Sequence, residues 1–239
     1  MSERMGFAWL SLCACLAVFA PAAHAGRPMA TDDASITYAG QCQAQLWLQH
    51  AAGENEFWLL PACSVSNDVE ITVGGAEHWS DSRDHETLWS AQLKFPLRAE
   101  APGDWGAALS VGWNHRESTA IENRVNAQPV NFVTTYLASD QGYAVHLNLG
   151  ARHDAEEDST QATWGAAYEH APSERFGEFV EIFGISGSAP SFQTGLRYDL
   201  VPDRVSVNCA AGAVLRDGLH EPFVTVGLNV FPGPSWPLL

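Results

Sequence analysis

The sequence predicts an all-β protein, and within that class a transmembrane, antiparallel, up-and-down β-barrel of about 12 strands. Segments of alternating apolar and polar residues, each about ten residues long, recur through most of the 239 residues. No long window shows the period of an amphipathic helix. The connections between the segments alternate in length and charge, as they do in outer-membrane barrels.

The predicted strands are each bounded by residues that favour turns, mainly glycine, proline, asparagine and aspartate. Their length is what a tilted strand needs to cross a bilayer. In chain order they are 41–50, 57–66, 69–79, 87–97, 104–114, 129–138, 142–152, 161–170, 176–186, 191–200, 204–215 and 222–231.

The predicted connections form two sets, and short periplasmic turns with longer extracellular loops are typical of an outer-membrane barrel. The short set comprises 66–68, 98–103, 139–141, 171–173 and 201–203. The other set is mostly longer and more charged, with 186–190 as a short exception, and comprises 51–56, 81–86, 115–128, 153–159 and 216–220.

The alternation assigns each strand an outward and an inward face. In 223–231, the side chains of Val224, Val226 and Leu228 share one face, and Thr225 and Asn229 share the other. A slip of one residue would turn inward cations elsewhere in the barrel to lipid, at a cost of roughly 2–4 kcal/mol each near the midplane. The face assignment is therefore well determined.

Aromatic residues fall near the strand ends, as in the two girdles of a membrane barrel. A secreted β-sandwich, the main alternative fold, does not predict two bands. We expect one band at the extracellular end (Trp58, Trp79, Trp89, Trp113, Trp164) and one at the periplasmic end (Phe95, Trp105, Tyr136, Tyr143, Tyr168, Tyr198, Phe231).

The first residues resemble a cleavable signal peptide, so we expect export. Phe7 to Ala20 is uncharged, and Ala23-His24-Ala25 fits a cleavage site. A lipoprotein signal around Cys13 and Cys15 is the alternative. The expected organisation is 1–25 signal peptide, 26–40 periplasmic N-terminal segment, 41–231 outer-membrane barrel and 232–239 C-terminal tail.

The net charge of −16 argues against a nucleic-acid partner, because phosphate contacts need a surplus of lysine and arginine. Several histidines lie near the predicted extracellular end, where a metal or pH-responsive cap is conceivable. We favour solvated loop histidines, since no His-x-His or His-x3-His spacing appears, and we predict neither a metal site nor a cofactor. These histidines are His50, His78, His85, His115, His153 and His220.

The N-terminal motif Arg27-Pro28-Met29-Ala30-Thr31-Asp32-Asp33-Ala34 resembles the R-P-L-x-T-D-D-A start of a family of Gram-negative outer-membrane proteins. That family is labelled as putative meta-pathway of phenol degradation proteins or outer-membrane transporters. The resemblance implies passive transport of small, aromatic or hydrophobic solutes. Two departures concern the first hairpin: glutamate often stands where this chain has Gln43 or Gln45, and Cys63-Ser64-Val65 replaces a Tyr-Gly.

Charged residues on the predicted lumen face are candidates for solute selection, because mixed-sign rings select solutes in channels. The alternative is a pairing network that merely fills the barrel. Inward glycines would favour an opening, since they leave space. The lumen candidates are Glu70, Lys94, His146, Arg152, Glu169, Glu181, Arg197, Asp199 and Arg204.

Two alternative functions were weighed against a channel. An outer-membrane lipid-modifying enzyme would need an outward Ser-His pair, but His146-Leu147-Asn148 lacks the serine and His146 falls on the lumen face. A structural or adhesive surface barrel would need long extracellular loops. We therefore expect a monomeric, non-enzymatic channel in the outer membrane of a Gram-negative bacterium, with outer-membrane lipid, the barrel-assembly machinery and a small solute as partners.

Two contacts are predicted near the periplasmic end. Cys42 and Cys63 lie almost opposite each other on adjacent strands in an oxidising compartment, which favours a disulfide, while Cys209 stays free. Asp32 and Asp33 are expected to fold into the barrel mouth and pair with Arg197 and Arg204. The N-terminal segment would then act as a partial plug; a loose leader is the alternative.

Overall fold

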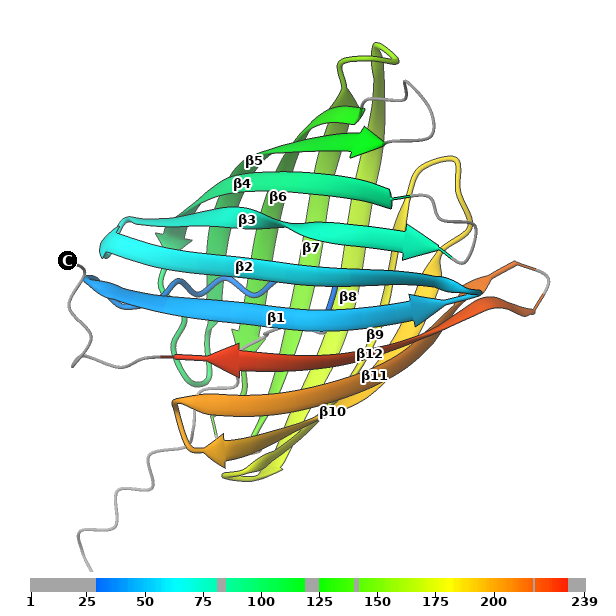
Figure 1. Cartoon of the computed structure of the whole chain (residues 1–239). Coiled ribbons are helices and arrows are strands. Elements are labelled where there is room, and N and C mark those ends of the chain that lie inside the picture. Colours follow the sequence, from blue (N-terminus) through cyan, green and yellow to red (C-terminus); the bar gives the residue numbers. More distant parts are fainter. Residues whose placement is uncertain (1–28, 81–84, 119–124, 140–141, 217, 232–239) are drawn as a thin grey trace, which may run out of the picture.

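The computed structural model is a closed barrel of 12 antiparallel strands (Figure 1), as the sequence predicts. It describes residues 29–80, 85–118, 125–139, 142–216 and 218–231. The predicted signal peptide and C-terminal tail, and with them Arg27 and Pro28, lie outside these ranges. Among the described residues, no helix is long and apolar enough to cross a membrane.

Each strand pairs with its neighbours in the chain, and β1 pairs with β12 to close the barrel, with Trp47 opposite Gly227. The strands are β1 (Gln41–Ala51), β2 (Glu54–Ser66), β3 (Val69–Ser80), β4 (His85–Arg98), β5 (Trp105–Ser118), β6 (Val125–Leu137), β7 (Tyr143–Asp154), β8 (Ser159–Ser173), β9 (Phe176–Ile185), β10 (Ser191–Val201), β11 (Val205–Leu215) and β12 (Leu219–Val230).

The side chains alternate between the outer face and the lumen. In β12, Val224 and Val226 are more than half exposed, whereas Thr225 and Asn229 are buried inside the barrel. Leu147 and Leu149 in β7 are likewise exposed. Apolar residues therefore cover the outside, and polar residues fill the lumen.

We call the end at which β1 begins the proximal end, and the opposite end the distal end. The proximal end carries the connections 67–68, 99–104, 138–142, 174–175 and 202–204. The distal connections are shorter than the sequence predicts, except 186–190, which has the predicted length. In place of a loop over 51–56, β1 and β2 are joined by the two residues Ala52 and Gly53, which both have positive φ.

The predicted loop over 115–128 and the predicted turn at 171–173 are also partly wrong. Strand β5 runs on to Ser118, β6 begins at Val125, and β8 continues to Ser173. Polar and charged residues at the strand ends continue the hydrogen-bonded ladder, so charge in a sequence does not by itself end a strand. The connections at the two ends consequently differ less in length than we expected.

The two-band hypothesis misplaces Trp58. Trp58 points into the lumen, where it stacks on the buried Trp47 with ring centroids 5.1 Å apart. Trp89, Trp105 and Tyr198 are about half exposed on the outer face, as expected. Trp58 was misassigned because its distance from the strand end gave its depth but not its face.

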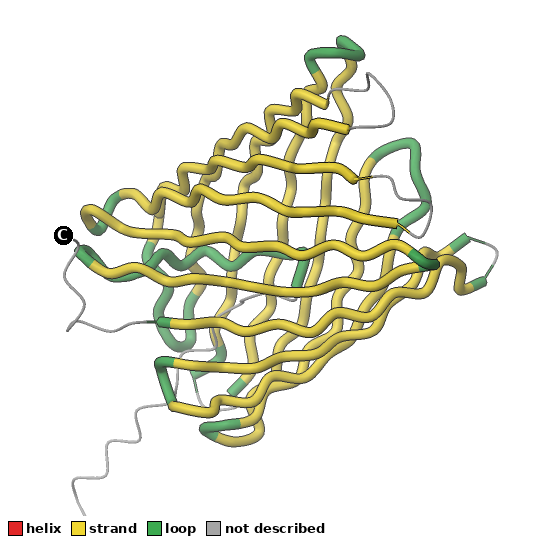
Figure 2. The backbone as a smooth tube through the Cα atoms, viewed as in Figure 1, coloured by secondary structure: helices red, strands yellow, loops and turns green. Residues whose placement is uncertain are grey.

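Residues 29–40 run through the lumen in the proximal half of the barrel, and buried apolar residues pack around them. We call residues 29–40 the lumen segment; it is the loop enclosed by the ring of strands in Figure 2. Met29 packs with Ala167, Phe179 and Ala210. The core of this protein is therefore built around its own N-terminal segment.

Candidate functional site: the lumen and its N-terminal segment

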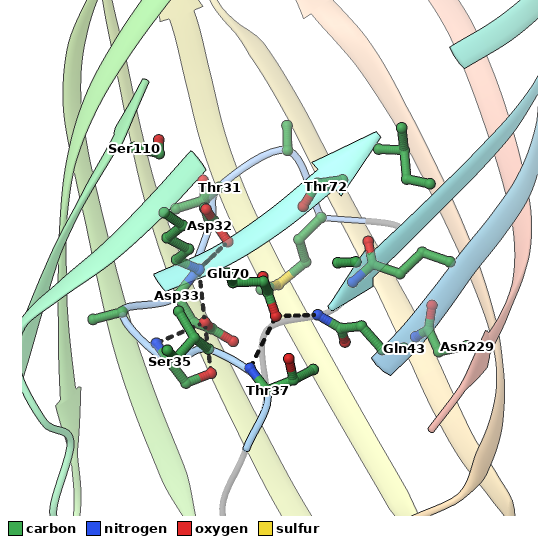
Figure 3. A pocket seen from close by; sticks show the side chains of 18 of the residues that line it. Thr31, Asp32, Asp33, Ser35, Thr37, Gln43, Glu70, Thr72, Ser110 and Asn229 are labelled. Carbon is green, nitrogen blue, oxygen red and sulfur yellow. Dashed lines mark hydrogen bonds and ion pairs between the residues drawn. The ribbon is translucent and has the colours of Figure 1, made fainter. Parts of the chain in front are cut away.

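The lumen segment joins β1 through a reversal at Gly40. This residue has a φ of 75°, which glycine adopts without strain, and its N–H donates to the carbonyl of Ser64 at 2.7 Å. Thr37 then bonds the hydroxyl of Ser64 (2.7 Å). Its N–H donates to Glu70 of β3 (2.9 Å), as Figure 3 shows. The chain is thus directed from the proximal rim into the barrel.

The middle of the lumen segment is held by the opposite wall. The N–H of Ala34 lies 2.9 Å from both Glu100 Oε1, in the β4–β5 connection, and Thr135 Oγ1 of β6. The methyl group of Ala34 packs against Ala108 and Val133. A residue without a large side chain fits here because the wall approaches the backbone directly.

The backbone of Asp32 is bound through both its N–H and its carbonyl group. Asp32 donates its N–H to Asn148 Oδ1 (2.9 Å), and Asn148 Nδ2 donates to the carbonyl of Asp32 (2.8 Å). A Cβ added at Gly165 of β8 would lie 2.7 Å from Thr31 Oγ1. Asn148 therefore binds the backbone, and Gly165 provides the space for it.

Glu181 of β9 binds the far end of the segment. Its two carboxylate oxygens accept the N–H groups of Ala30 and Thr31, each at 2.8 Å, and Gln193 donates its side-chain amide to the same carboxylate. Glu181 is 2% exposed. The lumen segment thus spans the barrel from the wall of β1–β3 to the wall of β7–β11.

Both aspartates of the N-terminal motif pair with Lys94 of β4. Lys94 Nζ lies 3.0 Å from Asp32 Oδ1 and 3.3 Å from Asp33 Oδ1, and the Lys94 and Asp33 side chains are almost fully buried. We expected Arg197 and Arg204 as the partners, and that expectation is wrong. The segment crosses the lumen instead of staying at the mouth, so its aspartates reach β4 rather than β10 and β11.

A second charged group lies on the wall of β7, β8 and β10. Arg197 is 2.8 Å from Glu169 Oε1 and 3.8 Å from Asp199. His146 is fully buried, with Thr135 Oγ1 2.9 Å from its Nδ1 and Glu169 Oε2 3.5 Å from its Nε2. These candidates form a connected network in the proximal half.

The other two candidates lie apart from this network. Arg152 is in the distal half of the lumen, 3.8 Å from Asp154. Arg204 is exposed in the β10–β11 connection, at the proximal mouth of the cavity. Cys42 and Cys63 form a disulfide, and Cys209 is a free, exposed cysteine.

Glu100 and Asn148 are the residues that we did not single out from the sequence. The sequence placed Asn148 on the lumen face but gave no reason to prefer it to other inward amides. Burial, and after it the negative charge of Asp33, raises the pKa of the Glu100 carboxyl to about 7. The length of the 99–104 connection was the available signal, since it lets Glu100 fold back over Gly106, where an added Cβ would lie 2.5 Å from Glu100 Cγ.

We expected the inward glycines to favour an opening, and the structure agrees in part. Gly106 accommodates Glu100, and Gly165 accommodates Thr31. A cavity of about 1540 Å³ extends along the lumen segment, and Gly112 and Gly165 are among the residues that line it. Its lining runs from Pro102 and Pro202 at the proximal end to Asn114 and Ile185 in the distal half. Within the described ranges, no group of three or more His, Cys, Asp or Glu residues is arranged to hold a metal.

The chain matches a known protein family. A family model described as "Uncharacterised conserved protein UCP029691" matches residues 13–231. No curated protein sequence matches the chain.

Solved structures at low identity share the barrel. The KdgM porin has a TM-score of 0.59 at 11% identity, over 79% of this chain and 98% of that one. The COG4313 outer membrane channel from Pseudomonas putida F1 has a TM-score of 0.56 at 9% identity, over 82% and 97%. An active-site mutant of outer membrane phospholipase A from Escherichia coli reaches 0.51 at 11% identity, over 87% and 94%.

Proposed function

The chain belongs to the UCP029691 family, and we propose that it is an outer-membrane β-barrel channel through which small solutes pass without chemical change. One observation carries the proposal: the barrel encloses a cavity of about 1540 Å³ whose lining extends from the proximal connections into the distal half. Apolar side chains cover the outside of the same barrel. Such a barrel suits a bilayer on its outer surface and water within.

The lumen segment acts as a partial plug in this proposal. It occupies the proximal half through hydrogen bonds to Glu70, Glu100, Asn148 and Glu181, and the cavity continues beside it. The passage is therefore narrowed there, and solute size is limited by the room left beside the segment.

The resemblance of the N-terminal motif to the phenol meta-pathway family suggests small aromatic or hydrophobic solutes. Trp58 and Phe183 line the cavity and offer apolar surface to such molecules. We further propose export by a cleavable signal peptide, insertion by the barrel-assembly machinery, and a monomer in the outer membrane of a Gram-negative bacterium.

We do not propose an enzyme. His146 would be the histidine of a lipid hydrolase, but it is 0% exposed and lies in the lumen, where a bilayer lipid on the outer face does not reach it. The phospholipase likeness is one of fold, which many functions share.

Single-channel recording in planar bilayers tests both parts of the proposal. The purified protein should give discrete conductance steps, and Asp32→Asn with Asp33→Asn should raise the conductance and speed protease clipping of the segment. The matched control is Glu156→Gln with Glu157→Gln, which also removes two negative charges, from the exposed β7–β8 turn.

The outcomes separate the two parts. If neither the unaltered protein nor the aspartate variant conducts, the channel proposal is wrong. If both conduct equally and the segment is clipped at the same rate, the channel stands and the plug is wrong.

A further inference from the structure

Negatively charged residues outnumber positively charged ones along the cavity. Of the described residues that line it, seven are Asp or Glu and four are Lys or Arg. The four cations are Lys94, Arg152, Arg197 and Arg204. The charge of the lining is thus negative before any pairing is considered.

Pairing removes most of the positive charge from the field that a solute meets. Lys94 lies between Asp32 and Asp33, at 3.0 and 3.3 Å, and faces Glu70 on the neighbouring strand. Arg197 is paired with Glu169 and Asp199, and Arg152 lies 3.8 Å from Asp154. Opposite charges at these distances cancel beyond about one Debye length, which is about 8 Å at physiological ionic strength.

The carboxylates of the proximal half are not cancelled in the same way. Glu70 and Glu181 accept N–H groups of the lumen segment at 2.8 to 2.9 Å. Backbone N–H groups are neutral, so they stabilise these carboxylates without removing their charge. The structure thus shows N–H donors seated on the carboxylates of the lumen wall.

Glu169 is different from these carboxylates. Its side chain is 5% exposed, its Oε1 accepts from Arg197, and its Oε2 lies 3.5 Å from His146 Nε2, an ion-pair distance. Glu169 is therefore balanced by its neighbours in the wall and does not add to the uncancelled charge.

We propose that the channel selects positively charged solutes, and among organic solutes those that carry protonated amines. This inference rests on the proposed channel function and names its solute class. Carboxylates in a lumen with low-dielectric walls concentrate cations and exclude anions, as acidic rings do in cation channels. An ammonium group can also take the place of the N–H donors that the carboxylates now hold.

The test is the reversal potential of the reconstituted protein in a KCl gradient, followed by block with matched solutes. We expect K⁺ to permeate several-fold better than Cl⁻. An alkyl diamine added to one side should reduce the K⁺ current, and a dicarboxylate of the same length should not.

Two pairs of substitutions assign the effect to the lumen carboxylates. Glu70→Gln with Glu181→Gln removes charge but keeps side-chain oxygens that can accept the segment's N–H groups. Because buried variants can fail to fold, Glu174→Gln with Asp203→Asn makes the same change at two exposed positions of the cavity mouth. Both pairs should lower the K⁺/Cl⁻ ratio, whereas the control Glu156→Gln, outside the cavity, should not.

The results distinguish the inference from the proposed function. Absence of conductance in every variant overturns the channel itself. Conductance with equal or greater Cl⁻ permeability overturns cation selection and leaves the channel standing. A K⁺ preference that neither pair reduces overturns the assignment to these carboxylates.

Discussion

The proximal and distal halves of the lumen are polar in different ways. In the proximal half, Glu70, Lys94 and Glu181 are almost fully buried and hold the lumen segment. In the distal half, the lining is mostly neutral, as at Gln92, Asn114 and Thr163. Arg152 is the charged residue among the described lining residues there. Buried charge thus occurs where a backbone segment is bound, and neutral polarity where the cavity is open.

This difference follows from the cost of burying polar groups. A charge taken out of water needs a partner, and a peptide unit inside a barrel needs acceptors and donors for its N–H and carbonyl groups. The proximal carboxylates and the lumen segment meet both needs at once. The distal side chains face the cavity, where water can hydrogen-bond to them, and need no such arrangement.

The largest effect is expected from Lys94→Met. This change leaves Asp32 and the buried Asp33 without their cation, and breaking a buried pair costs about 3 kcal/mol or more. The free energy of unfolding in detergent should fall accordingly, measured with urea and the fraction of protein that keeps its folded mobility on an unboiled gel. Adding Asp32→Asn and Asp33→Asn should recover most of the loss. Full stability of Lys94→Met alone would contradict the pairing.

A matched pair of asparagines compares the two halves directly. Asn148→Ala leaves the N–H and carbonyl of Asp32 unsatisfied, which should weaken the seating of the segment by about 2 kcal/mol. Protease clipping within the segment should then rise by more than about tenfold. Asn114→Ala in the distal half should leave the clipping rate unchanged. Equal rates in both variants would mean that Asn148 does not hold the segment.

The seating of the segment should also depend on pH through Glu100, which faces Asp33, His146, Thr135 and the Ala34 N–H. Its pKa is raised from the ordinary value of 4.5 to about 7, so the folded state favours the protonated carboxyl. The contribution of Glu100 to the stability of the folded state is therefore complete below pH 4.5 and is lost as the pH rises to about 7. Clipping should therefore increase between pH 5 and 7, by at most about tenfold per pH unit. Glu100→Gln should flatten this profile, and an unchanged slope in that variant would assign the titration to another group.

The smallest effect is expected from Arg152→Gln in the distal half. Arg152 is 39% exposed and lies 3.8 Å from Asp154, so the pair is partly screened by water. Its loss should change the free energy of unfolding by about 0.5 kcal/mol or less. A loss as large as that of Lys94→Met, in the same urea titration, would show that the two halves do not differ in the way described.

The local pattern of the sequence was sufficient to predict the wall of the barrel. The alternation along β12 assigns Val224 and Val226 to the outside and Thr225 to the lumen, and the turn residues give the number of strands. The spacing of Cys42 and Cys63 about the first hairpin is enough to place them opposite each other. These features depend on the two-residue period of a strand and on pairing between chain neighbours, which are local properties.

The contents of the lumen were decided only by the tertiary structure. Closure of β1 on β12 sets how far Lys94, Glu100 and Glu181 stand from residues 29–40. Asp32 and Asp33 therefore pair with Lys94 and not with Arg197 and Arg204, although the sequence predicts that all three cations face inward. The sequence by itself specifies which face a side chain occupies. The distance across the lumen depends on the curvature and tilt of all 12 strands together, and no local pattern encodes it.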